Sequence, residues 1–190
     1  MNTNAESKHT VDQDNTSFPK IISKSALVAL GMALLVLGLL APYANAETPI
    51  SMADTNFILA AAQGGMTEVR LGELASTNGV REGVKDFGRM MVKDHTAINN
   101  DLKALAAQKG VTLPDSLDAK HKAMVDKMAV LTGSEFDDAY IKAMIKVHQK
   151  DARAFKAESA ATQDADIKSF LDKSIPVVEA HLTHITELQP

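Results

Sequence analysis

Four residues of metal-ligand type lie among regularly spaced apolar residues: Glu68, His95, His148 and His181. Around each of them, apolar residues recur every three or four positions, which predicts that each lies on the buried face of a helix. A buried polar group without a partner costs roughly 1–3 kcal/mol. Four such groups at similar depth are therefore expected to satisfy one another or to share an ion. Neutral imidazole and carboxylate are ligands that Zn, Fe, Mn and Cu ions accept.

Three further side chains extend this predicted metal site. Asp94 directly precedes His95, whereas Asp151 and His184 each follow a predicted ligand by three residues. Residues three apart lie on the same side of a helix. We expect the two aspartates to accept hydrogen bonds from the outer ring nitrogens of the histidines, and His184 to be a further outer partner or an alternative ligand.

A structural role is the alternative for these histidines. In that case their rings are hydrogen-bonded core groups, and the protein is a non-enzymatic structural or interaction module of the cell envelope without a metal. Thioethers are soft ligands that would suit copper(I), but at helical spacing methionine is usually core filler. We interpret five methionines in this way: Met90, Met91, Met124, Met128 and Met144.

Catalysis finds little support in the sequence. There is no Ser-His-Asp order, no glycine-rich phosphate loop and no spaced carboxylate pair that would indicate an enzyme. The formal net charge is −4, and charges of both signs are interspersed, so no basic cluster indicates nucleic acid as a partner. Cysteine is absent, which excludes a disulfide framework and a cysteine-based zinc site. The sequence indicates no particular protein partner.

The elements that must position these residues are helices. The apolar periodicity predicts long helices at residues 53–77, 81–109, 135–161 and 165–188, and a shorter one at 116–131. Long amphipathic helices joined by short loops pack as antiparallel neighbours. The fold class is therefore all-α, an antiparallel four-helix bundle with a short extra helix before the third long one.

Local signals refine the helix ends and contacts. Ser51 or Asp54 is expected to cap the first helix, and Ser134 with Asp137 resembles a capping box. Gly64-Gly65 within the first helix predicts the close approach of a neighbouring helix. Pro176 should kink the last helix, because it removes one backbone hydrogen bond.

The N-terminal segment has the form of an export signal. Lys20 and Lys24 precede an apolar run at residues 26–41, and Ala44-Asn45-Ala46 has the small-x-small form that signal peptidase recognises. The run is shorter than the roughly 20 residues of a membrane span. We expect a signal peptide with a long polar leader at residues 1–46, cleavage after Ala46, and a mature domain at 47–190 without a membrane span. The alternative is an uncleaved N-terminal anchor, and both place residues 47–190 in the periplasm or outside the cell.

Several blocks of the sequence resemble an exported bacterial family of unknown function, whose members are labelled periplasmic or outer-membrane proteins. The resemblance spans residues 52–188. The blocks that carry it are Ala62-Gln63-Gly64-Gly65-Met66-Thr67-Glu68-Val69, Met91-Val92-Lys93-Asp94-His95, Lys109-Gly110-Val111-Thr112-Leu113-Pro114 and the segment from Phe136 to His148.

This resemblance implies a ferritin-like four-helix bundle with no established reaction. In the family an acidic residue usually precedes each of three histidines, but here only Asp94 keeps that place, since Val147 and Ala180 stand before the other two. The Glu-x-x-His pairs of ferritin-like di-iron proteins are absent, because Val92 and Val178 occupy the positions of the glutamates. We therefore expect an exported bundle that binds one transition metal ion in its core, with an envelope or stress role.

Overall fold

The computed structural model describes residues 50–190, so the predicted signal peptide and its cleavage site lie outside the described residues. The described part of the chain forms five α-helices and no strand. Four are long: α2 at Met52–Asn78, α3 at Glu82–Gln108, α5 at Gly133–Ala161 and α6 at Ala165–Glu187. The short helix α4 covers Ala119–Ala129. The prediction of an all-α bundle of four long helices with one short extra helix is confirmed.

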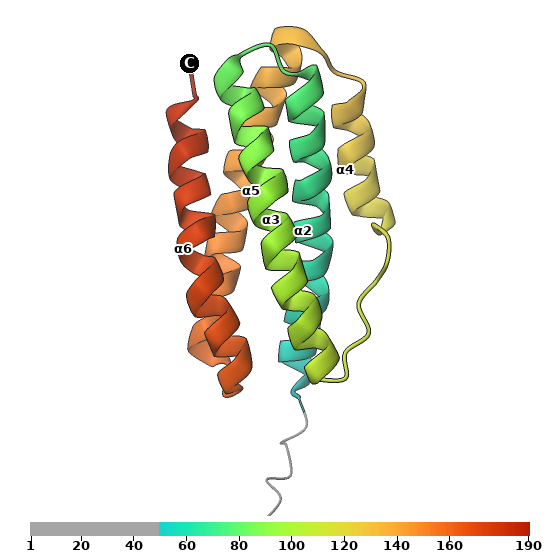
Figure 1. Ribbon diagram of the computed structural model, residues 1–190, viewed down its shortest axis with the longest axis vertical. Coiled ribbons are helices and arrows are strands. Elements are labelled where there is room, and N and C mark those ends of the chain that lie inside the picture. The colour runs from blue at the N-terminus through green and yellow to red at the C-terminus, as the bar shows by residue number, and fades with distance from the viewer. Residues whose placement is uncertain (1–49) are drawn as a thin grey trace, which may run out of the picture. The chain divides into compact units, whose positions relative to one another are not determined.

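The four long helices run side by side as two hairpins, α2 with α3 and α5 with α6 (Figure 1). Helix α3 packs on α6 and α2 packs on α5, whereas α4 lies against the outer side of α2. The connection from α3 to α5 runs back along the whole bundle and includes α4 (Figure 1). One long crossover of this kind fits the connectivity of ferritin-like bundles.

Three of the helices have an N-cap residue whose side chain accepts a hydrogen bond from a backbone N–H of the first turn. Ser51 Oγ accepts from the backbone N–H of Asp54 at the start of α2, and Asp118 and Asp164 do the same for α4 and α6. The predicted capping box at Ser134 is wrong, because α5 begins one residue earlier, at Gly133. Asp137 is buried and instead accepts from the backbone N–H groups of Val80 and Arg81, at the start of α3. Its carboxylate therefore caps a neighbouring helix rather than its own.

The α2–α3 hairpin is the most closely packed pair, and glycines explain why. A Cβ added to Gly72 would lie 2.7 Å from the carbonyl oxygen of Gly88, and one added to Gly88 would lie 2.7 Å from that of Gly72. Gly65 also faces α3, where a Cβ would clash with the Asn99 side chain. Gly64 differs from the prediction, since a Cβ there would meet nothing within 4 Å.

Two apolar clusters fill the bundle at different heights. One includes Leu71, Phe87 and Tyr140, and the other includes Ile58, Leu102 and Leu171. On each long helix the predicted ligand lies between residues of the two clusters. Together these four ligands, Glu68, His95, His148 and His181, form a polar layer between the clusters. Helix α6 continues through Pro176. Within residues 50–190, no helix combines the length and apolar character needed to cross a membrane.

Candidate metal centre

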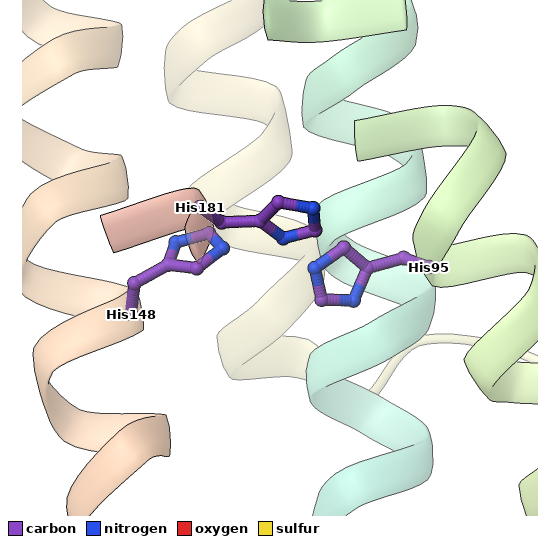
Figure 2. Close-up of side chains that lie close together, drawn as sticks. All are labelled: His95, His148 and His181. Atoms are coloured by element: carbon purple, nitrogen blue, oxygen red, sulfur yellow. The ribbon is translucent and has the colours of Figure 1, made fainter. Parts of the chain in front are cut away.

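The three predicted histidine ligands converge in the middle of the bundle. His95 comes from α3, His148 from α5 and His181 from α6, and their rings point toward one another (Figure 2). One ring nitrogen of each lies within 4.8 Å of the other two. The ring centroids are 5.2–5.8 Å apart, and all three residues are at most 3% exposed. Three imidazoles are thus held in a space that a single ion could fill.

Glu68 of α2 lies against two of these rings. Its Oε2 is 3.0 Å from Nδ1 of His95, and its Oε1 is 3.6 Å from Nε2 of His148. The residue is only 4% exposed. Glu68 is not one of the three mutually close ligand groups. It contacts the cluster from α2, the one long helix that contributes no histidine.

Hydrogen bonds on the outer side fix the tautomers of two rings. Nδ1 of His148 lies 2.9 Å from the backbone carbonyl of Met144, which can only accept, so this nitrogen carries the hydrogen. Nε2 of His181 lies 3.1 Å from the Asp94 carboxylate and donates to it. The lone pairs of His148 Nε2 and His181 Nδ1 are therefore free. Metal-binding histidines are usually held by a second bond of this kind.

Several of the inward atoms are buried without a hydrogen-bond partner in the described part of the chain. They are Glu68 Oε1, both ring nitrogens of His95, His148 Nε2 and His181 Nδ1. His95 Nδ1 is close to Glu68, but the contact does not have hydrogen-bond geometry. Native proteins rarely leave buried polar atoms unpaired, since each costs about 1–3 kcal/mol. One nitrogen of each ring together with the Glu68 oxygen could share a cation as partner, since each neutral ring offers one lone pair.

The protonation state of the cluster suits a metal ion. Burial lowers the pKa of His95 well below its ordinary value, and the nearby rings of His181 and His148 lower it further. Burial likewise lowers the pKa of His148 to about 4, despite its bond to Met144. Burial also lowers the pKa of His181, against the opposing effect of Asp94. The three rings are thus neutral near pH 7, which is the form that binds metals.

Glu68 responds to burial in the opposite sense. Burial raises its pKa well above the ordinary value, and the nearby carboxylate of Asp151 raises it further. Burial therefore disfavours the carboxylate form of Glu68 in the absence of an ion, and a cation bound by the histidines would favour that form.

The three outer residues differ in position. Asp94 accepts from a ring nitrogen of His181 across the α3–α6 interface and not from its chain neighbour His95. Asp151 is half-buried near Glu68, and the nitrogen predicted as its partner is bonded to Met144 instead. His184 packs edge-on against Phe87, with ring centroids 5.6 Å apart, and is not among the three mutually close ligand groups.

Some residues of the site have no sequence signal of their own. Phe87 packs its ring edge-on against both His148 and His181, at centroid distances of 6.2 and 6.1 Å. The methionines behave as predicted core filler, since Met91, Met128 and Met144 are buried in the Phe87 cluster. The partner carbonyl of His148 belongs to the residue four positions earlier. That spacing is the one signal that could have indicated it.

Solved structures share this fold at low sequence identity. CopM in its Cu(I)-bound form is 18% identical with a TM-score of 0.59, and CopM in its Ag-bound form is 18% identical with a TM-score of 0.58. Each match covers 70% of this chain and 93% of CopM. A DUF305 fragment from Deinococcus radiodurans is 11% identical with a TM-score of 0.65, covering 74% of this chain and 97% of the fragment. These likenesses establish the helical-bundle fold.

Sequence comparison defines the family. No curated protein matches the chain. The model of one family, described as a domain of unknown function (DUF4142), matches residues 39–188. That match spans all five helices and all four residues of the polar layer. The resemblance predicted from the sequence blocks is thereby confirmed, and the chain belongs to the DUF4142 family.

Proposed function

We propose that this protein binds one transition metal ion in its core, through His95, His148 and His181 with Glu68 as the fourth ligand. The observation that carries the proposal is the convergence of three buried imidazole nitrogens within 4.8 Å. Each comes from a different helix, and the free lone pairs have no other partner in the described residues. A purely structural role for these histidines would leave four buried ring nitrogens without a hydrogen-bond partner in the described residues.

Copper is the metal to test first. Imidazole binds Zn, Cu, Fe and Ni ions, and affinity generally peaks at Cu²⁺ in this series. The fold neighbour CopM has been solved in Cu(I)-bound and Ag-bound forms, which supports the same choice here. The layer offers neutral nitrogens and one carboxylate, a set that also suits Zn²⁺. We infer a binding role, such as metal sequestration in the cell envelope under stress, rather than catalysis.

Elemental analysis of the full chain, purified without a histidine tag, tests this proposal. Separate samples are loaded with copper, zinc, iron and manganese and then desalted. We expect about one equivalent of at least one metal to remain bound. Less than about a tenth of an equivalent of every metal would refute the proposal and support the structural alternative.

Variants locate the bound metal. His148→Leu should abolish binding, because it removes a ligand from the centre of the cluster. His184→Leu is the matched control, since His184 lies one turn from His181 but is not among the close ligand groups. We expect this control to retain its metal. Equal losses in the two variants would mean that the metal binds elsewhere.

The export of the protein is a separate part of the proposal. The basic residues, apolar run and Ala44-Asn45-Ala46 motif of residues 1–46 support cleavage after Ala46 and a mature domain at 47–190. N-terminal sequencing of the protein recovered from the cell envelope tests this. A chain that begins with Glu47 would support cleavage, whereas an intact leader would favour the anchor.

A further inference from the structure

A cavity of about 720 Å³ opens beside the polar layer and is lined mainly by α2, α3, α4 and α5. Its volume lies in the range of pockets that hold small organic ligands, about 300–1,000 Å³. The walls are largely apolar and include Phe57 and Phe155, whose rings meet edge-on at 5.3 Å. Glu68 and His95 form part of its deep end. The cavity exists where the helices pack least closely, since α5 makes few contacts with α2 and α4.

The mouth of this cavity is positively charged. Only six of its lining residues are exposed, and apart from two alanines all of them are cations: Lys120, Lys146, Lys150 and Arg153. None of the four forms an ion pair with another described residue. The chain as a whole has a net charge of −4, so this concentration of positive charge is local. Clefts lined by one sign of charge attract ligands of the opposite sign.

The acidic residues of the cavity do not cancel this charge. Glu68 and Asp151 are the two carboxyl groups in the lining, and neither is exposed at the mouth. Four cations against two carboxyl groups leave the lining with a net positive charge, and that charge lies at the mouth.

We propose that the cavity binds a small amphiphilic monoanion of the fatty-acid class. Its carboxylate would lie among Lys120, Lys146, Lys150 and Arg153, and its alkyl chain would extend inward past Phe57 and Phe155. An apolar cavity with a cationic mouth matches both parts of such a ligand. This binding goes beyond the proposed metal function, and metal-free protein tests it separately.

Gly64 provides a variant that fills the cavity without disturbing the fold. The residue lines the cavity, and a Cβ there meets nothing within 4 Å. Gly64→Leu therefore places a large side chain in open space, and it also replaces glycine within a helix by a better helix former. Gly64→Ala is the matched control, because it gains helix propensity but occupies little of the cavity.

Isothermal titration calorimetry of the metal-free full chain with decanoate tests the proposal. We expect saturable binding, weakened at least about tenfold in Gly64→Leu and little changed in Gly64→Ala. Lys146→Glu with Lys150→Glu should weaken binding about tenfold, since each rim charge contributes up to about 1 kcal/mol. The matched pair Lys168→Glu with Lys173→Glu changes exposed lysines of α6 outside the cavity and should bind as the native chain does.

Three results would overturn this inference. The first is that the native chain does not bind decanoate. The second is that Gly64→Leu binds decanoate as tightly as the native chain, which would place the ligand outside the cavity. The third is equal affinity for decanoate and 1-decanol, which would show that the cationic mouth does not select an anion.

Discussion

Replacing His95 by leucine distinguishes a metal ligand from a structural core histidine. Both ring nitrogens of His95 are buried without a hydrogen-bond partner in the described residues, and the residue is only 3% exposed. Leucine removes these unsatisfied atoms, whose burial costs about 1–3 kcal/mol. What is lost is the 3.0 Å contact with Glu68, which lacks hydrogen-bond geometry and is therefore worth no more than about 1 kcal/mol.

We therefore expect metal-free His95→Leu to be as stable as the native chain, or more stable by up to about 2 kcal/mol. With metal bound, the native chain should instead be more stable relative to His95→Leu than it is without metal. At 100 times its dissociation constant, a metal ion would stabilise the native chain by about 2.7 kcal/mol and His95→Leu not at all. The native chain should thus gain stability on metal loading, whereas the variant should not.

Urea unfolding followed by far-UV circular dichroism measures both quantities, with and without a chelator. His184→Leu is the control, because it also replaces a histidine by leucine but lies outside the close cluster. The reasoning is refuted if metal-free His95→Leu loses more than about 1 kcal/mol. Such a loss would show that His95 supports the fold through bonds that the native structure needs.

Three further predictions follow from the same structure. Metal-free protein should lose stability as pH falls from about 6.5 to about 4, because the unfolded chain protonates His148 near the ordinary value while the folded chain resists until about 4. The raised pKa values of Glu68, Asp151 and Glu158 act in the opposite sense, so the contribution of His148 is isolated by comparing urea midpoints of the native chain and His148→Leu across this range; equal slopes in the two chains would contradict the prediction. Asp94→Asn should weaken metal binding about 10–100-fold, since it weakens the acceptor that orients a ligand ring; chelator competition measures this, and unchanged affinity would exclude the orienting role. Gly88→Ala should destabilise the α2–α3 hairpin by about 1–3 kcal/mol, whereas Gly64→Ala should stabilise by up to about 1 kcal/mol; thermal melts of both variants would show equal shifts if helix packing did not matter.

The helices were predictable because their signals are local. Apolar periodicity and residues such as Ser51 and Asp164 act within a few positions, so the predicted helix ends lie within three residues of those observed. The three histidines were predictable as inward groups for the same reason. The sequence could not predict that the three rings lie at the same level along the bundle, because that level depends on how far each connection shifts one helix along another.

The features missed in the sequence depend on contacts between distant residues. Asp137 caps the start of α3, which lies more than 50 positions earlier in the chain. Asp94 bonds a ring from α6 rather than the ring of its chain neighbour His95. Gly72 and Gly88 bring two backbones together, and neither residue has a local pattern that indicates this. The cavity likewise arises from the spacing of helices that are distant in the sequence.

The three histidines of the polar layer come from both helical hairpins. His95 belongs to the α2–α3 hairpin, whereas His148 and His181 belong to the α5–α6 hairpin. Contacts within each hairpin are more extensive than those between the hairpins. A metal ion held by all three rings would therefore join the bundle at its weaker interface. Because the apolar cluster around Phe87 is built from both hairpins, we expect the bundle to fold without the ion.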